Sequence, residues 1–101
     1  NNVYVCDGGG RFLGAVSLHD IKPYLGQLDL AGLVIARDIM REDFPRIGPD
    51  QTLSEALGMF LHQPLERLPV VVPATGVLVG SLSKSDLLLA LVEKRKKLEP
   101  A

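Results

Sequence analysis

Two seven-residue segments of this chain share a spaced pattern of a glycine, a serine and an aspartate. The first is Gly14-Ala-Val-Ser-Leu-His-Asp20 and the second is Gly80-Ser-Leu-Ser-Lys-Ser-Asp86, so each shared position recurs after 66 residues. A constant offset at three chemically different positions indicates an internal repeat. The repeat constrains the fold most strongly, because each copy is expected to form the same supersecondary unit.

The second copy carries the apolar patterns of a complete α+β unit. It predicts strand, helix, strand, strand and helix over residues 44–48, 53–61, 68–72, 77–82 and 83–97. Asp50 or Thr52 is suited to cap the first of these helices, and Glu55 stands three positions after Thr52, as in a capping box. The spacing of apolar residues in this copy therefore switches between the period of a strand and that of a helix.

The first copy shows only the later part of this pattern. A hairpin over residues 3–16 and a short helix beginning at Ser17 are predicted. At the same offset position 1 matches Arg67, and the counterpart of Phe44 would precede the chain, so we expect a first repeat that is incomplete at its N-terminus. The expected division is the end of repeat 1, a connector, repeat 2 and a tail, at residues 1–26, 27–43, 44–97 and 98–101.

Composition narrows the classes of function. The net charge is −1, with 11 basic and 12 acidic residues, so the chain lacks the basic balance typical of nucleic-acid binding. The single cysteine, Cys6, cannot form an internal disulfide, which favours a reducing compartment. No apolar run approaches the roughly 18–20 residues that cross a bilayer, and no leader peptide is recognised. We expect a globular piece with no nucleic-acid partner and no membrane insertion of its own.

Catalytic and metal chemistry find little support in the residues. Cys6, His19 and His62 lack the paired spacing of metal ligands. The glycine-rich stretch 7–11 lacks the lysine and hydroxyl residue of a phosphate-binding loop, and is better interpreted as a hairpin turn. No nucleophile lies beside a recognisable base. The sequence therefore predicts no metal site, no catalytic residues and no enzyme activity.

The serine and aspartate of each copy fit two interpretations. Ser17 and Ser83 are good N-cap residues, and an acidic residue three positions later completes a cap that needs no ligand. The start of a helix also offers free N–H groups and partial positive charge to a phosphate. A hydroxyl there can donate to phosphate, and a carboxylate one turn later can accept from ribose hydroxyls. From the residues alone, both interpretations stay open.

The complete unit, with Leu68-Pro-Val-Val71 on its central strand and Gly80 to Asp86 before its last helix, resembles the CBS domain. Residues 36–40 also resemble the lead-in common in that family. CBS domains usually act as tandem pairs. The resemblance therefore implies a CBS-pair fold of the α+β (α/β) class, with two βαββα-type repeats packed sheet to sheet and the first of them incomplete.

The resemblance also implies binding residues. In CBS pairs that hold adenosine ligands, the hydroxyl residue contacts phosphate and the aspartate contacts ribose. Carried over, Ser17 and Asp20 serve one site, Ser83 and Asp86 serve the other, and Ile47 with its neighbouring backbone helps to hold the base. The family more often has threonine where these serines stand. The implied ligand is a regulatory adenine nucleotide (ATP, ADP or AMP), with no required cofactor.

A narrower resemblance concerns the connector. Residues 28–40, following 20–25, resemble the region between the repeats in bacterial ClC-type chloride channels and transporters. This implies a homodimeric regulatory domain on the cytoplasmic side of the membrane, attached to the transmembrane domain of a parent protein. Two alternatives stay open, namely a ligand-free structural dimerisation module and a regulatory insert of an enzyme such as a nucleotide dehydrogenase.

Overall fold

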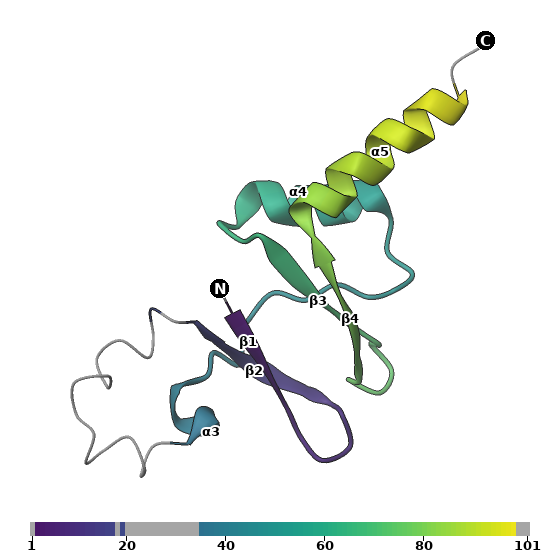
Figure 1. Cartoon of the computed structure of the whole chain (residues 1–101). Coiled ribbons are helices and arrows are strands. Elements are labelled where there is room, and N and C mark those ends of the chain that lie inside the picture. The colour runs from purple at the N-terminus through teal and green to yellow at the C-terminus, as the bar shows by residue number, and fades with distance from the viewer. Residues whose placement is uncertain (1, 18, 20–34, 99–101) are drawn as a thin grey trace.

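A computed structural model describes residues 2–17, 19 and 35–98, and its elements form two hairpins and three helices (Figure 1). In chain order these are β1 Asn2–Cys6, β2 Phe12–Ser17, α3 Ala36–Ile39, α4 Leu53–His62, β3 Arg67–Val71, β4 Leu78–Ser83 and α5 Lys84–Leu98. Apart from Ser17 and His19, the predicted helix after β2 lies outside the described residues. Within these ranges no helix combines the length and apolar character needed to cross a membrane.

The two hairpins are built alike, as the repeat predicts. β1 pairs antiparallel with β2, β3 pairs antiparallel with β4, and both pairs contain a bulge at the same place, after Val5 in one and after Val70 in the other. The sequence alignment of the first strands was wrong by one residue. Asn2, rather than position 1, matches Arg67, because the turn of the second hairpin is one residue longer and shifts its first strand against the constant offset.

The predicted strand over residues 44–48 is also wrong in extent. Ile47 alone pairs with β3, donating to Pro69 O at 3.0 Å and accepting from Val71 N at 2.8 Å. Two prolines flank Ile47, Pro45 and Pro49, and neither has the N–H group that a longer ladder requires. A single parallel bridge is therefore all that this segment forms.

The predicted cap of α4 is confirmed. Thr52 is the N-cap residue, and its Oγ1 accepts from Glu55 N at 3.1 Å and donates to the Glu55 carboxylate at 3.2 Å. The Gln51 side-chain amide also donates to that carboxylate at 2.9 Å. The hydrogen bond from Gln51, followed by those from Thr52, lowers the pKa of Glu55.

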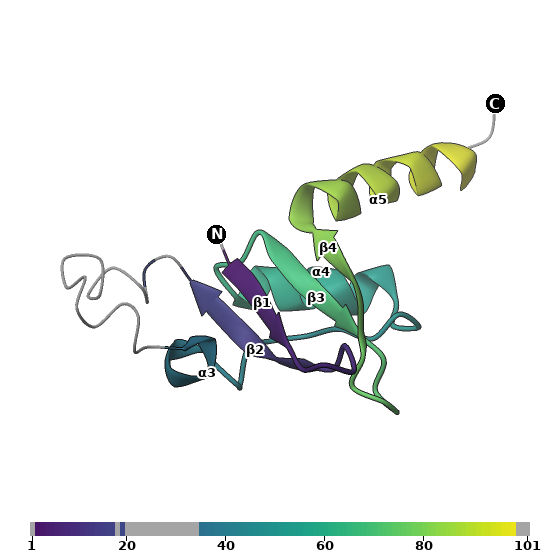
Figure 2. The same cartoon turned by 60° about the horizontal axis from the view of Figure 1, so that its bottom comes forward.

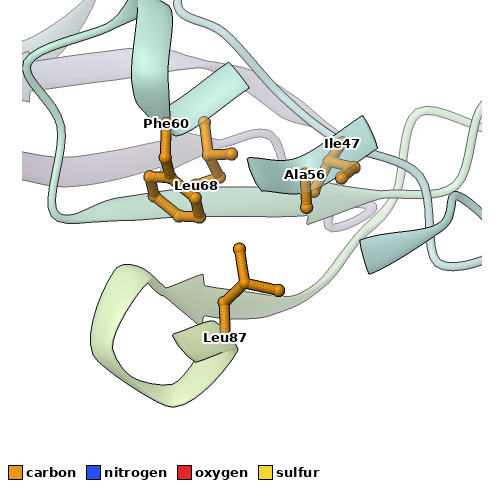
Figure 3. Close-up of a cluster of buried hydrophobic side chains, with 5 residues drawn as sticks. All are labelled: Ile47, Ala56, Phe60, Leu68 and Leu87. Carbon is orange, nitrogen blue, oxygen red and sulfur yellow. The ribbon is translucent and has the colours of Figure 1, made fainter. Parts of the chain in front are cut away.

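The larger core cluster joins α4 to the second hairpin and α5. Figure 3 shows Leu87 of α5 pointing toward the side chains that come from α4 and β3. The buried members are Ile47, Ala56, Phe60, Leu68 and Leu87. Burial of each large apolar side chain of this kind contributes about 1.5–3 kcal/mol. This cluster therefore fixes the position at which α5 begins.

A second cluster lies between the two hairpins and packs them together. Its buried members are Phe12, Ala15, Phe44 and Val71. Tyr4 of β1 adds an edge-to-face contact with Phe12, with ring centroids 5.8 Å apart and planes at 80°. Because the cluster draws on both hairpins, the sheet-to-sheet packing expected of a tandem repeat is present.

The turns of the two hairpins meet through a reciprocal pair of hydrogen bonds. Phe12 N donates to Gly76 O at 2.8 Å, and Leu78 N donates to Gly10 O at 3.0 Å. The two donors, Phe12 and Leu78, stand 66 residues apart, and so do the two acceptors, Gly10 and Gly76. The two bonds are therefore related by an approximate internal twofold axis.

The axis itself passes close to a pair of equivalent residues, Arg11 and Val77, which form an antiparallel bridge. Beside them stand Gly10 and Gly76, whose φ angles are both positive, at 81° and 77°. An L-residue with a side chain adopts this left-handed conformation only with strain, so glycine suits both positions. The two turns therefore share a glycine in the left-handed backbone conformation at the equivalent position.

Candidate functional site

The second copy of the repeated motif stands where β4 ends and α5 begins. Ser83 is buried, with 7% of its surface exposed, and its Oγ accepts from Asp86 N at 3.0 Å. Lys84 N donates to Glu66 O at 2.8 Å. The structure therefore brings Ser83 and Asp86 together as predicted and shows Ser83 capping α5.

Arg67 lies directly opposite Ser83 in the β3–β4 ladder. Side chains at opposite positions of an antiparallel pair share one face, with Cβ atoms about 4.5–5.5 Å apart. Arg67 is exposed, and its guanidinium has no partner among the residues that the structure describes. The residue opposite Ser83 in the ladder thus carries a positive charge. Sequence reasoning missed this residue, because only the pairing register reveals that it faces Ser83.

A pocket of about 450 Å³ opens between the two hairpins, and Arg67 lines it, whereas Ser83 and Asp86 do not. Its lining comes from β1, from the loop before β3 and from the first residue of β3, namely Asn2, Tyr4, Pro64, Leu65, Glu66 and Arg67. Pockets that hold small ligands typically measure about 300–1,000 Å³. Tyr4 also links the hairpins by a hydrogen bond of 3.3 Å between its hydroxyl and Ser81 Oγ.

The Asp86 carboxylate completes the polar groups near this helix start. It is exposed, and within the described ranges it forms no hydrogen bond or ion pair. Its backbone N–H donates to Ser83 Oγ, and the two oxygens of its carboxylate are able to accept hydrogen bonds from a ligand. The start of α5 thus combines a hydroxyl, a carboxylate and a nearby guanidinium.

The first copy can be placed only in part. Ser17 is the last residue of β2 and pairs with Asn2, which lines the pocket. Asp20 lies outside the described residues, so its predicted partnership with Ser17 stays a prediction. Asn2 occupies the position that corresponds to Arg67, and the first copy therefore presents an amide where the second presents a cation.

Ile47 does not line the inter-hairpin pocket, but it belongs to the core and also lines a separate cavity of about 240 Å³ with Gly48 and Val71. Its side chain is 4% exposed and belongs to the cluster around Leu68, and both of its backbone polar groups are bonded to β3. A contact between Ile47 and a base stays a prediction. The described geometry places this residue both in the core and at the edge of that smaller cavity.

Metal ligation finds no candidate in the described part of the chain, where no three His, Cys, Asp or Glu side chains gather closely enough to hold an ion. The polar groups at the start of α5 are of the kinds that bind an anion and hydroxyl groups. Such a combination suits a ligand that carries both an anionic group and hydroxyl groups.

Comparison with known proteins agrees with this architecture. The family model described as "CBS domain" matches residues 36–93. No curated protein matches the chain as a sequence relative. Among solved structures, a Vibrio cholerae protein assigned to acetoin utilization (AcuB) is 27% identical, with a TM-score of 0.76, and the match covers 98% of this chain and 74% of that one.

Two further structures share the fold at lower identity. CBSX2, solved in complex with AMP, is 22% identical with a TM-score of 0.73, over 93% of this chain and 73% of its own. The cystathionine beta-synthase pair domain of a protein assigned as a Mg²⁺ transporter in Shewanella oneidensis is also 22% identical, with a TM-score of 0.77, over 94% and 52%. The family model spans more than half of the chain and the solved structures share its fold, so this chain belongs to the CBS domain family.

Proposed function

We propose that the chain is a non-catalytic regulatory module that binds an adenine nucleotide between its two hairpins. The observation that carries the proposal is the position of Arg67, which faces Ser83 across the β3–β4 ladder and lines the inter-hairpin pocket. A guanidinium beside a helix start is a favourable environment for phosphate. The AMP complex of the similar CBSX2 supports the choice of ligand.

In this proposal each polar group has one role. Arg67 and the Ser83 hydroxyl donate to phosphate oxygens, and the Asp86 carboxylate accepts from the ribose hydroxyls. Ser83 can cap and bind at once, because its Oγ accepts from Asp86 N while its O–H remains able to donate. Ser17 and Asp20 are proposed to play the same parts in the first repeat. Ile47 is proposed to contribute backbone near the base.

Regulation would follow from the position of the pocket. Its lining comes from both hairpins, so a bound nucleotide stabilises one arrangement of the two repeats over others. A ligand shifts such an equilibrium only by its difference in affinity between the arrangements. We further propose that the module is attached, on the cytoplasmic side, to a membrane transporter of the ClC type. The similarity to the pair domain from a Mg²⁺ transporter supports a transporter parent of some kind.

Calorimetric titration of the chain with AMP, ADP and ATP tests the binding proposal. Replacement of Arg67 by glutamine removes a charge-assisted hydrogen bond worth about 1.5–3 kcal/mol, so we expect affinity to fall roughly 10- to 150-fold. Lys94→Gln, which removes one exposed charge farther along α5, is the matched control and should leave the affinity unchanged. Equal affinities of the two variants would contradict the proposal.

A second candidate function is a structural dimerisation module, and one observation favours it. α5 exposes apolar side chains on its surface, namely Leu88, Leu89 and Val92, at 46%, 59% and 51%. We propose that this face mediates a homodimer. Sedimentation velocity should show a dimer that Leu89→Asp dissociates. Val3→Asp, a change at an equally exposed residue of β1, should leave the dimer intact. A wild-type chain that sediments as a monomer at high concentration would exclude this interface.

A further inference from the structure

The turn of the first hairpin places an aspartate directly before a glycine. Asp7 O accepts from Gly10 N at 3.1 Å, so Gly8 and Gly9 occupy the centre of a β-turn. Gly8 is exposed, and a Cβ there would meet no atom within 4 Å. No other aspartate or asparagine of the sequence precedes a glycine. Because glycine has no side chain to hinder its own backbone N, this dipeptide is the one in the chain most susceptible to aspartate isomerisation.

Isomerisation is a rearrangement of the backbone that needs no oxidant and no enzyme. The Gly8 N attacks the Asp7 Cγ, so that an N–C bond forms and a C–O bond breaks. The N–H proton and the hydroxyl leave as water, and a five-membered imide results. Water then opens the imide, either on the Cγ side, which restores aspartate, or at the backbone carbonyl, which gives isoaspartate. The carboxyl reacts in its neutral form, because a carboxylate is a poor electrophile.

The folded turn holds the Asp7 carboxylate in its charged form. Oδ1 accepts from Gly9 N and Arg11 N, both at 2.9 Å, and Oδ2 accepts from Arg11 Nε at 2.9 Å. The hydrogen bond from Arg11 N lowers the pKa of Asp7, and the bonds from Gly9 N and the Arg11 guanidinium lower it further. The neutral carboxyl that reacts is therefore scarce, and both of its oxygens are bound by donors.

We propose that the Arg11 guanidinium protects the Asp7–Gly8 peptide from isomerisation, by binding the carboxylate oxygen that the backbone N–H groups of the turn leave free. The site matters to the module because the same turn carries Gly10, whose carbonyl accepts from Leu78 N at 3.0 Å in the other hairpin. Isoaspartate lengthens the backbone by one atom at Asp7, and it converts the carbonyl that accepts from Gly10 N into a free carboxylate. The guanidinium thus preserves a contact between the two repeats.

The test compares the rate of isoaspartate formation in the wild type and in Arg11→Gln, each incubated folded in mildly acidic buffer. The Arg11 side chain is 66% exposed, so its replacement leaves both core clusters intact. Digestion with a protease that cuts before aspartate but not before isoaspartate, followed by mass spectrometry, measures the modified fraction at Asp7. We expect a several-fold faster rate in Arg11→Gln. Arg41→Gln is the matched control, because Arg41 is also exposed and its Nε lies 3.8 Å from the Asp43 carboxylate, and it should react at the wild-type rate.

The same measurement in concentrated guanidinium chloride separates protection by the fold from an effect of sequence. There the wild type and Arg11→Gln should isomerise equally fast, and both faster than the folded wild type, because the turn no longer holds Arg11 against Asp7. Equal folded-state rates in the wild type and Arg11→Gln, or an equal acceleration by Arg41→Gln, would overturn the proposal.

Amide exchange tests the consequence for the contact between the repeats. Wild-type chains that carry isoaspartate, isolated by chromatography, should exchange the Leu78 N–H faster than unmodified chains. Val71 is the internal control, because its N–H is bonded to Ile47 O at 2.8 Å within the second repeat, and its exchange should not change. Unchanged exchange at Leu78 would show that the modified turn still reaches the other hairpin, which contradicts the proposed role.

Discussion

Ser83 shows how a single hydroxyl can satisfy two demands that the sequence left as alternatives. Its Oγ accepts from Asp86 N, which caps α5, and its residue stands opposite Arg67 in the β3–β4 ladder. A hydroxyl offers one donor and two acceptor sites, so capping uses only part of its capacity. The capping interpretation is thus shown, while the ligand interpretation stays a proposal that it does not exclude.

Replacement of Ser83 by alanine should destabilise the chain. The loss of an N-cap hydroxyl costs about 0.5–2 kcal/mol, and the free energy of unfolding in urea is the measurement. Ser83→Thr retains the hydroxyl and should recover most of the stability. An alanine variant as stable as the wild type would show that the bond to Asp86 N contributes nothing.

The positive φ of Gly76 gives a second prediction at this scale. Gly76→Ala should lower the free energy of unfolding by about 1–2 kcal/mol, because alanine adopts the left-handed region only with strain. Gly58→Ala lies within α4, where alanine is favoured over glycine by about 0.5–1 kcal/mol, and should raise it. Thermal and urea unfolding should therefore show Gly76→Ala to be less stable, and Gly58→Ala to be more stable, than the wild type.

At the scale of elements, local chemistry made the predictions that succeeded. The Thr52 cap, both hairpins and the start of α5 depend on residues close in sequence, and all are confirmed. The prediction of a strand over 44–48 was wrong because Pro45 and Pro49 lack the N–H groups that a longer ladder requires. An apolar pattern gives no information about backbone N–H groups. The one-residue shift of Asn2 depends on turn length, which only the pairing reveals.

The cap of α4 gives a pH prediction. Hydrogen bonds from Gln51 and Thr52 lower the pKa of Glu55 in the folded state below its ordinary value of 4.5. Glu55 therefore contributes stability that is fully present above 4.5 and is lost as pH falls through the lower folded-state pKa. The difference in unfolding free energy between the wild type and Glu55→Gln should shrink on acidification. A difference that is constant with pH would show that the carboxylate charge is irrelevant.

At the scale of the whole molecule, the candidate site could not be derived from the sequence in full. Ser83 and Asp86 came from the repeat, whereas Arg67 and the inter-hairpin pocket depend on strand register and on the packing of one hairpin against the other. These are long-range features, and the apolar pattern of a single strand carries no information about its neighbour. The partnership of Ser17 with Asp20 stays untested.

Packing between the hairpins should be essential for the molecule as a unit. Phe44 is 2% exposed in the cluster that joins them, and its ring lies 6.3 Å from that of Tyr4. Phe44→Ala should cost about 3–5 kcal/mol of unfolding free energy. Leu61→Ala, at a side chain 70% exposed, should change it little. Urea unfolding measures both, and a small effect at Phe44 would mean that the hairpins are held together elsewhere.

The reciprocal hydrogen bonds that Gly10 and Gly76 accept join the two repeats within one chain, which allows the repeats to differ in sequence. In a dimer of identical chains, such a contact would depend on protein concentration, and both equivalent positions would carry the same residue. Joining the halves in one chain makes the contact intramolecular and independent of concentration. The halves are then free to diverge, as Asn2 and Arg67 have done, so that a symmetric scaffold presents two unequal surfaces.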